Sequence, residues 1–226
     1  MIALLVGIVL VFYNMVYTEK RDNIIKDGQM TAIQSADVFN DYLSTSIDAI
    51  KLTAYTIDGM LETSTNEQIL DYLVGQTSAI TSTVFENTSG LYGYINGEFL
   101  DGLLWVPDDD FVPTERPWYI KAIENKGEIA MIEPYLDAQT GEVLMAISKM
   151  LSDGESVISL DITLDVIQQI TEGAVETDSS DMEFIVDNRG MVIAHSDSEE
   201  VGKDYNEERD SVGAAVMALI NQSDED

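Results

Sequence analysis

Apolar residues fill the start of the chain and then settle into a helical repeat. Residues 2–17 are predominantly apolar, and Asn14 is the one strongly polar residue among them. Between Leu43 and Leu61, apolar residues recur every three or four positions, which places their side chains on one face of a helix. The repeat predicts a long helix over residues 18–62, whose apolar stripe serves core packing or a dimer seam.

The apolar start is slightly shorter than the roughly 20 residues that span a bilayer. Its aromatic residues gather at the C-terminal end, as at a membrane interface, and neither a basic leader nor a small-residue cleavage site is visible. We therefore predict an uncleaved transmembrane helix over residues 1–17, with a buried soluble helix as the alternative. Lys20 and Arg21 follow it and, taken alone, favour a cytoplasmic position for the rest of the chain.

A second helix is predicted over the segment STNEQILDYLVGQTSAI. Ser64 or Thr65 is suited to cap its first turn, and Glu67 follows Ser64 by three residues, as in a capping box. This helix opens a module that we place at residues 63–172.

After residue 87 the helical spacing of apolar residues gives way to alternating apolar and polar residues, as in strands. LYGYINGEFLDG predicts a hairpin with Asn96 and Gly97 as its two-residue turn. A loop with prolines at both ends follows, and RPWYIKAIENKG predicts a short helix with Pro117 in its first turn and Gly127 at its end.

Three further strands are predicted at EIAMIEPYLD, GEVLMAISKML and ESVISLDI. The tight turns between them, at 138–141 and 152–154, favour antiparallel neighbours. With the hairpin they make an α+β module that resembles a PAS-type sensor fold, an antiparallel sheet of five strands closed by a helix over TLDVIQQITEG.

The last part of the chain predicts a second hairpin. After the polar segment AVETDSSD, MEFIVDNRGMVIAHS predicts a hairpin turning at 188–190, and RDSVGAAVMALINQ predicts a helix. One hairpin and one helix do not bury a sheet face. We therefore expect residues 173–226 to be the start of a second, incomplete PAS-like module.

Composition excludes several classes of function. The chain has 42 acidic and 11 basic residues, a net charge of −31, and so lacks the basic surface that nucleic acids require. It has no cysteine and a single histidine, His195, which we interpret as a surface or strand-end residue. The acids at 108–110 lack the spacing of a calcium loop. We predict no catalytic residue, no metal site and no cofactor.

One cluster of residues suits a small charged ligand. The planar fork of Arg116 matches a carboxylate, and Trp118 and Tyr119 add N–H and O–H donors near the start of a helix. Phe111 lies just before them. Each also has an ordinary structural interpretation, since Arg116 has many acids to pair with and the aromatic residues suit a core.

A second cluster offers negative charge. Tyr135 and Asp137 are two residues apart on a predicted strand and so share a face, and Asp161 ends what we take to be the neighbouring strand. Two carboxylates there attract an ammonium group, so the two clusters together match a zwitterion. Asp137 is equally suited to the turn DAQTG.

The order of these segments resembles a known family. A membrane helix, a long helix, FVPTERPWY, EPYLDAQTGEVLMAIS and VISLDITL together resemble the double-Cache extracytoplasmic sensor domains of bacterial chemoreceptors and sensor kinases, in the subgroup that binds amino acids. The resemblance implies that Arg116, Trp118 and Tyr119 hold the ligand's carboxylate. It implies that three further residues hold its amino group: Tyr135, Asp137 and Asp161. Phe111 stands where the family pattern has a tyrosine.

The resemblance also orients the chain, because such modules lie outside the membrane. The expected function is therefore non-catalytic sensing of a free amino acid by a membrane-anchored domain, with a homodimer through the long helix. Three alternatives stay open. The same fold could bind an amine, a purine or another metabolite. The chain could instead be an acid-dependent hydrolase, or an interaction module without a ligand.

Overall fold

The structure is a computed structural model. It describes residues 2–83, 88–141, 143–163, 184–186, 190–195 and 197–206, together with 213, 215 and 217. The side chains of residues 1–16 lie outside this description, and the predicted transmembrane segment falls on them. In the described part of the chain, no helix combines enough length with enough apolar character to cross a membrane.

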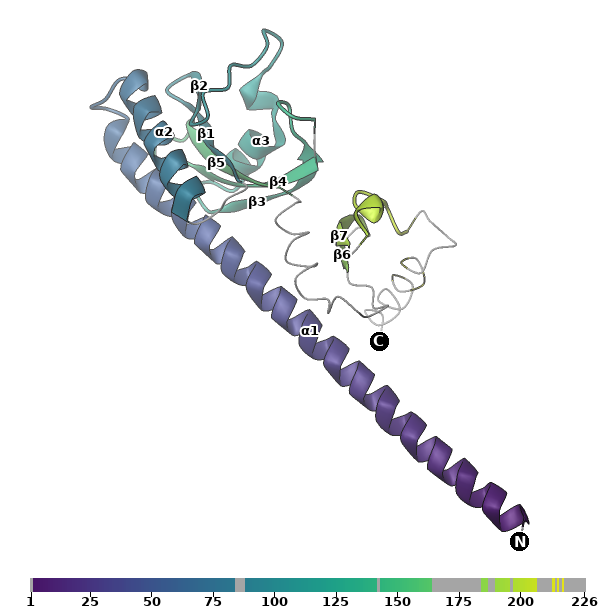
Figure 1. The fold of residues 1–226 in the computed structure, drawn as a ribbon. Coiled ribbons are helices and arrows are strands. Elements are labelled where there is room, and N and C mark those ends of the chain that lie inside the picture. The colour runs from purple at the N-terminus through teal and green to yellow at the C-terminus, as the bar shows by residue number, and fades with distance from the viewer. Residues whose placement is uncertain are drawn as a thin grey trace.

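Residues 2–60 form one helix, α1 (Ile2–Met60), without a break between the two segments predicted from the sequence. Figure 1 shows it running along the sheet and projecting far beyond it. The predicted apolar stripe packs against the sheet: Ile50, Ala54 and Ile57 are fully buried. Of the two uses predicted for the stripe, core packing is therefore confirmed over this part of the helix.

Helix α2 (Asn66–Thr83) follows after a short turn. Its capping box is formed by Thr65 and Gln68: the Gln68 N–H donates to Thr65 Oγ1 (3.4 Å), and the Thr65 N–H donates to Gln68 Oε1 (3.0 Å). Thr65 is thus the cap of the two candidates, and the predicted pairing of Ser64 with Glu67 is wrong by one residue.

Strands β1 (Thr88–Ile95) and β2 (Glu98–Asp101) form the predicted hairpin. Asn96 and Gly97 have φ values of 49° and 82°, as a type I′ turn requires at both central positions. After η1 (Pro113–Glu115), α3 (Pro117–Glu124) is the predicted short helix.

Strands β3 (Ala130–Leu136), β4 (Val143–Met150) and β5 (Val157–Thr163) complete an antiparallel sheet of five strands in the order β2-β1-β5-β4-β3. The β1–β5 pair joins the first and last of these five strands, with Tyr92 opposite Ser159 and Tyr94 opposite Val157. The predicted α+β, PAS-like fold is therefore confirmed for this part of the chain.

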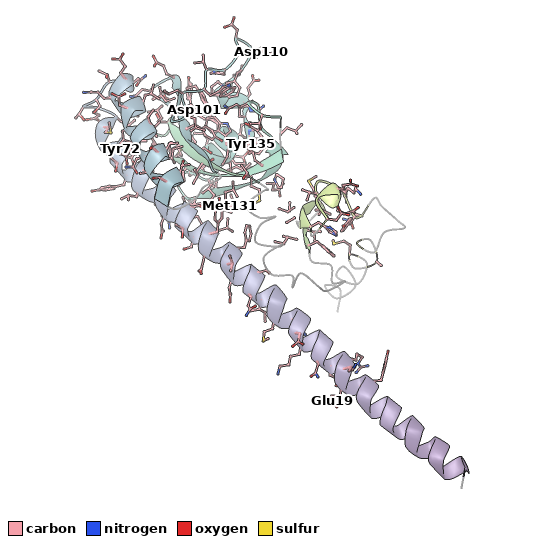
Figure 2. All side chains as sticks on the ribbon, viewed as in Figure 1. Glu19, Tyr72, Asp101, Asp110, Met131 and Tyr135 are labelled. Atoms are coloured by element: carbon pink, nitrogen blue, oxygen red, sulfur yellow. The ribbon has the colours of Figure 1, made fainter. Side chains whose placement is uncertain are left out.

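Helices cover both faces of this sheet. Helices α1 and α2 lie side by side on one face and α3 lies on the other (Figure 1). The α1–α2 face buries the larger core, with Leu91, Ile147 and Leu160 of three adjacent strands. The α3 face buries Tyr92, Trp118 and a set of small residues. In Figure 2 the side chains of Asp101 and Tyr135 lie on the sheet, far from Glu19 on the projecting part of α1.

A second hairpin, β6 (Phe184–Val186) and β7 (Val192–His195), matches the strands predicted near the C-terminus. His195 ends its strand as expected, but it is buried at 2% exposure, so its interpretation as a surface residue is wrong. Its ring stacks on Phe184 (5.7 Å between centroids) and its Nδ1 accepts a hydrogen bond from the Asp197 N–H (2.8 Å). The predicted closing helix after Thr163, the linker, the turn at 188–190 apart from Gly190, and most of the last helix lie outside the described residues.

Candidate functional site

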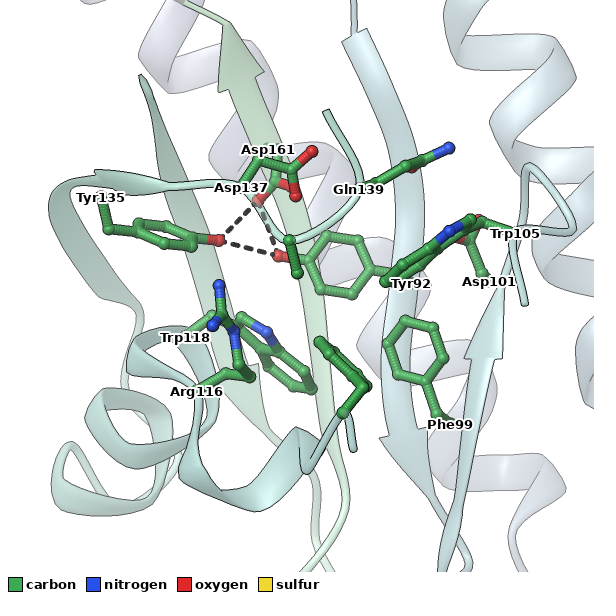
Figure 3. A pocket seen from close by; sticks show the side chains of 12 residues that line it. Tyr92, Phe99, Asp101, Trp105, Arg116, Trp118, Tyr135, Asp137, Gln139 and Asp161 are labelled. Carbon is green, nitrogen blue, oxygen red and sulfur yellow. Dashed lines mark hydrogen bonds between the residues drawn. The ribbon is translucent and has the colours of Figure 1, made fainter. Parts of the chain in front are cut away.

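An open pocket lies between the α3 face of the sheet and the loops around it, with about 370 Å³ of empty space including its mouth. Strands β1, β2, β3 and β5, helix α3 and two loops contribute to its wall (Figure 3). Twelve residues line it: Tyr92, Phe99, Asp101, Trp105, Phe111, Arg116, Trp118, Tyr135, Asp137, Ala138, Gln139 and Asp161.

The structure brings six of the seven predicted site residues to this one pocket. They are Phe111, Arg116, Trp118, Tyr135, Asp137 and Asp161. Tyr119 is not among the lining residues: its ring packs edge-on against Tyr94, and its hydroxyl donates to the Glu155 carbonyl (3.0 Å). Successive residues of a helix point about 100° apart, so α3 cannot turn both Trp118 and Tyr119 towards the same cavity.

Arg116 is the one cation among the residues that line the pocket. It precedes α3 with extended backbone, and one Nη2 hydrogen bond to the Leu136 carbonyl (2.9 Å) ties it to the end of β3. Its guanidinium lies 5.8 Å from the ring centroid of Phe111 and 5.9 Å from that of Tyr135. These contacts fix the plane of the guanidinium while leaving further N–H donors for a ligand.

Two tyrosine hydroxyls meet at Asp161. Tyr92 donates to Asp161 Oδ1 at 2.6 Å, Tyr135 lies 3.2 Å from the same oxygen, and the two hydroxyls are 3.2 Å apart. Figure 3 shows this triangle across the cavity from Arg116 and Trp118. The site therefore has a guanidinium at one side and a hydrogen-bonded carboxylate at the other.

The sequence placed Asp161 on the strand next to Tyr135, and this is wrong, because β4 lies between β3 and β5. Tyr135 reaches across it because Ala146, directly opposite Asp161 in the β4–β5 ladder, has a side chain of a single methyl group. A register shift between Ile132 and Tyr135, at Pro134, accompanies this reach.

Burial raises the pKa of Asp161 to about 7, and repulsion from Asp137 and Asp101 acts in the same direction. The hydrogen bonds from Tyr92 and Tyr135 oppose that rise because they stabilise the ionised form. The pKa of both tyrosine hydroxyls is raised, first by burial and then by the Asp161 charge. The tyrosines are therefore donors at neutral pH, and Asp161 is a carboxylate that a nearby cation would stabilise.

Asp137 closes a turn and also lines the pocket. Its Oδ2 accepts hydrogen bonds from the N–H and the hydroxyl of Thr140 (2.8 Å each), which closes the β3–β4 turn. It also lines the pocket, together with Ala138 and Gln139 of the same turn. The turn thus places a carboxylate on the pocket wall.

Six lining residues were missed by sequence reasoning: Tyr92, Phe99, Asp101, Trp105, Ala138 and Gln139. Phe99, Trp105 and Phe111 form an aromatic wall, with ring centroids 5.2–5.8 Å apart. Alternation along the first hairpin was the available signal, since Tyr92 shares its sheet face with Phe99 and Asp101. The aromatic residues matched a core pattern equally well.

Three carboxylates and one guanidinium therefore surround an aromatic-walled cavity. Among the described residues, no three acidic or histidine side chains are grouped as metal ligands would be. The arrangement suits a ligand that presents a carboxylate to Arg116 and a cationic, hydrogen-bonding group to Asp161 and Asp137.

Sequence comparison relates the chain to chemotaxis receptors. No family model matches it. TlpB, a methyl-accepting chemotaxis protein of Bacillus subtilis, is 38% identical over 85 residues, which are 38% of this chain and 13% of TlpB. A probable methyl-accepting chemotaxis protein of Bacillus thuringiensis is 24% identical over 180 residues, 79% of this chain and 27% of that protein. The chain thus matches a minor part of these relatives' length.

Solved structures share the fold. The ligand-binding domain of the Pseudomonas fluorescens chemoreceptor CtaA, in complex with L-isoleucine, aligns with a TM-score of 0.62 and 24% identity over 80% of this chain and 73% of that one. The domain of the Pseudomonas aeruginosa amino-acid chemoreceptor PctC, in complex with GABA, aligns with a TM-score of 0.62 and 22% identity over 81% and 79%. These neighbours have the PAS-like Cache fold, which this chain shares.

Proposed function

We propose that this chain is the ligand-sensing domain of a transmembrane chemoreceptor and that it binds a free amino acid in the pocket beside α3. The observation that carries the proposal is the opposition of Arg116 to Asp161 across a single cavity. The chemotaxis proteins among its relatives and the ligand-bound neighbours support the same conclusion.

In the proposed complex, Arg116 binds the α-carboxylate through N–H groups not used by Leu136. Trp118, buried at 2% exposure, forms the cavity wall beside it. Tyr119 supports Trp118, since their rings meet edge-on at 5.9 Å. We therefore assign Tyr119 a positioning role instead of the ligand contact that the family resemblance implies.

The α-ammonium group binds Asp161 and Asp137, with Tyr92 and Tyr135 as the hydroxyls around it. Because a buried carboxylate is costly without a cation, ligand binding and ionisation of Asp161 favour each other. Phe111 contributes apolar surface and carries no hydroxyl. The roles assigned to the pocket residues are binding roles, and we infer that the domain is non-catalytic.

We further infer that the domain lies outside the cell, anchored through residues 1–17. The chain has no cysteine, so a single cysteine introduced at exposed Asp109 reports its side of the membrane. Labelling of intact cells by a membrane-impermeant maleimide supports this placement, and labelling only after lysis refutes it.

A thermal-shift panel tests the proposed function. A ligand that binds only the folded state raises the melting temperature by mass action. We expect L-amino acids to raise it and their N-acetylated and decarboxylated analogues to do so much less. If only amines or purines raise the melting temperature, the ligand is one of these and not an amino acid. Turnover of a bound compound would contradict a non-catalytic role.

A further inference from the structure

We propose that Asp101 makes this pocket selective for amino acids whose side chain carries a second positive charge. The inference rests on the proposed function and adds the class of ligand to it. Asp101 is the last residue of β2 and lines the pocket.

Asp101 is a buried carboxylate that is only half satisfied by the protein. It is 7% exposed and lines the cavity. Its Oδ1 accepts the Leu103 N–H at 2.6 Å, and its Oδ2 has no partner among the described residues. Because Asp101 lines the pocket, this oxygen is accessible to a ligand that enters it. The free oxygen of Asp101 therefore favours a ligand that brings a donor to this end of the pocket.

In the proposed complex the other two carboxylates of the pocket bind the α-ammonium group. Asp161 accepts from two tyrosine hydroxyls, and Asp137 is fixed by Thr140. With Arg116 as the one cation in the lining, the pocket carries an excess of negative charge. A zwitterion leaves this excess unchanged because its two charges cancel. A ligand with one more cation reduces it.

The register of the sheet sets the distance between the two anionic ends. Asp101 pairs with Tyr92 across β1–β2, and β5, which carries Asp161, is the next strand. Tyr92 also pairs with Ser159, so Asp161 lies two strands from Asp101 and two residues further along β5, roughly 12 Å between backbones. Lysine, ornithine and arginine carry their two cationic groups at opposite ends of an extended chain, which matches this separation.

The wall between the two ends suits such a side chain. Phe99 is two residues before Asp101 on β2 and so shares its face, and the rings of Phe99 and Trp105 are 5.8 Å apart, edge to face. Aromatic surface packs against an aliphatic stem and attracts a cation over its face. A neutral polar side chain gains only the first of these effects.

Calorimetric titration of the 226-residue chain at pH 8 with L-arginine and its uncharged isostere L-citrulline tests the inference. We expect arginine to bind about tenfold or more tightly, as for one charge-assisted hydrogen bond. In Asp101→Asn the preference should fall to about twofold, with citrulline affinity nearly unchanged. This variant keeps Oδ1 as acceptor for Leu103. Asp109→Asn, which removes the same charge from the exposed loop, should retain the preference.

Equal affinity of the unmodified chain for both ligands, or a preference that survives in Asp101→Asn, would overturn the selectivity and leave amino-acid binding intact. Failure of every amino acid to bind would overturn the proposed function as well. If Asp101→Asn does not fold, lysine against Nε-acetyl-lysine on the unmodified chain decides. A preference of about tenfold for lysine supports the inference, and equal binding refutes it.

Discussion

Two tyrosine hydroxyls hold the carboxylate of Asp161 in the pocket. Tyr92 and Tyr135 provide two donors to one oxygen, which lowers the cost of ionisation without removing it. Burial still keeps the pKa of Asp161 at about 7. The side chain is therefore divided between protonated and ionised forms near neutral pH, and a bound ammonium selects the ionised form.

This predicts a pH dependence of binding. Below pH 7 a proton competes with the ligand's ammonium for Asp161, so affinity for a neutral-side-chain amino acid such as L-citrulline should rise on the order of tenfold from pH 5.5 to 8. Calorimetry in buffers of matched ionic strength measures it. Asp161→Asn should weaken binding and flatten the pH profile. An unchanged profile in this variant would show that another group titrates.

The stability of the ligand-free chain should change in the opposite direction. The folded pKa of Asp161 is above its ordinary value of 3.8, so the unfolded state loses its proton first as pH rises. The contribution of Asp161 to stability is thus complete below about pH 4 and is lost as pH rises through 7. Ligand-induced melting shifts should accordingly be larger at pH 8 than at pH 5.5.

Charge, spacing and the family resemblance together predicted Arg116 and Asp161 as site residues, although Arg116 also had an ordinary structural interpretation. Both line the pocket, and their binding roles stay predictions. Tyr119 was grouped with Trp118 because both offer donors, although adjacent positions on one helix face different directions. Asp101 was overlooked because an acid at the end of a hairpin strand is commonplace in a chain with 42 acidic residues.

At the scale of elements, the pocket depends on how the first hairpin is seated on α2. The Leu91 N–H donates to Thr77 Oγ1 of α2 at 3.0 Å, and the Gly102 N–H donates to the Leu91 carbonyl at 2.8 Å. These bonds hold the end of β2, and with it Asp101, against the helix. Gly102 is closely surrounded: a Cβ there would meet Thr77 Oγ1 and lie 2.8 Å from two backbone carbonyls.

Gly102→Ala should therefore destabilise the domain by about 2 kcal/mol or more, the scale of overpacking at a rigid site. The matched control is Gly75→Ala, in the exposed interior of α2, where an added Cβ meets nothing within 4 Å. It should stabilise the domain by about 0.5–1 kcal/mol through helix propensity. Urea unfolding measures both. Equal effects of the two substitutions would contradict the tight seating of the hairpin.

Element types were predictable because their signals are local. Asn96 and Gly97 specify a type I′ turn, and short turns specify antiparallel neighbours for the last three strands. The pairing of β1 with β5 has no such local signal, because β2, α3, β3 and β4 separate the two strands along the chain. That pairing places Tyr92 beside Asp161, so the hydroxyl triangle could not be predicted from the sequence.

At the scale of the whole molecule, the sheet separates the pocket from the long helix. Trp118 and the pocket lie on the α3 face, and α1 packs on the opposite face (Figure 1). The Asp58 side chain of α1 accepts the N–H of Ser152 at the β4–β5 turn (2.8 Å). This hydrogen bond links α1 to the β4–β5 turn. The dimer along this helix stays a prediction.

The central claim is that Arg116 binds the carboxylate of the ligand. Calorimetry with two ligands and two proteins tests it most directly. The ligands are the amino acid with the largest melting shift and its decarboxylated amine, and the proteins are the parent chain and Arg116→Gln. We predict that the substitution weakens binding of the amino acid about thirtyfold or more and binding of the amine by less than about threefold, since the amine has no carboxylate for Arg116 to bind. Equal losses for both ligands, or no loss for either, would contradict the account.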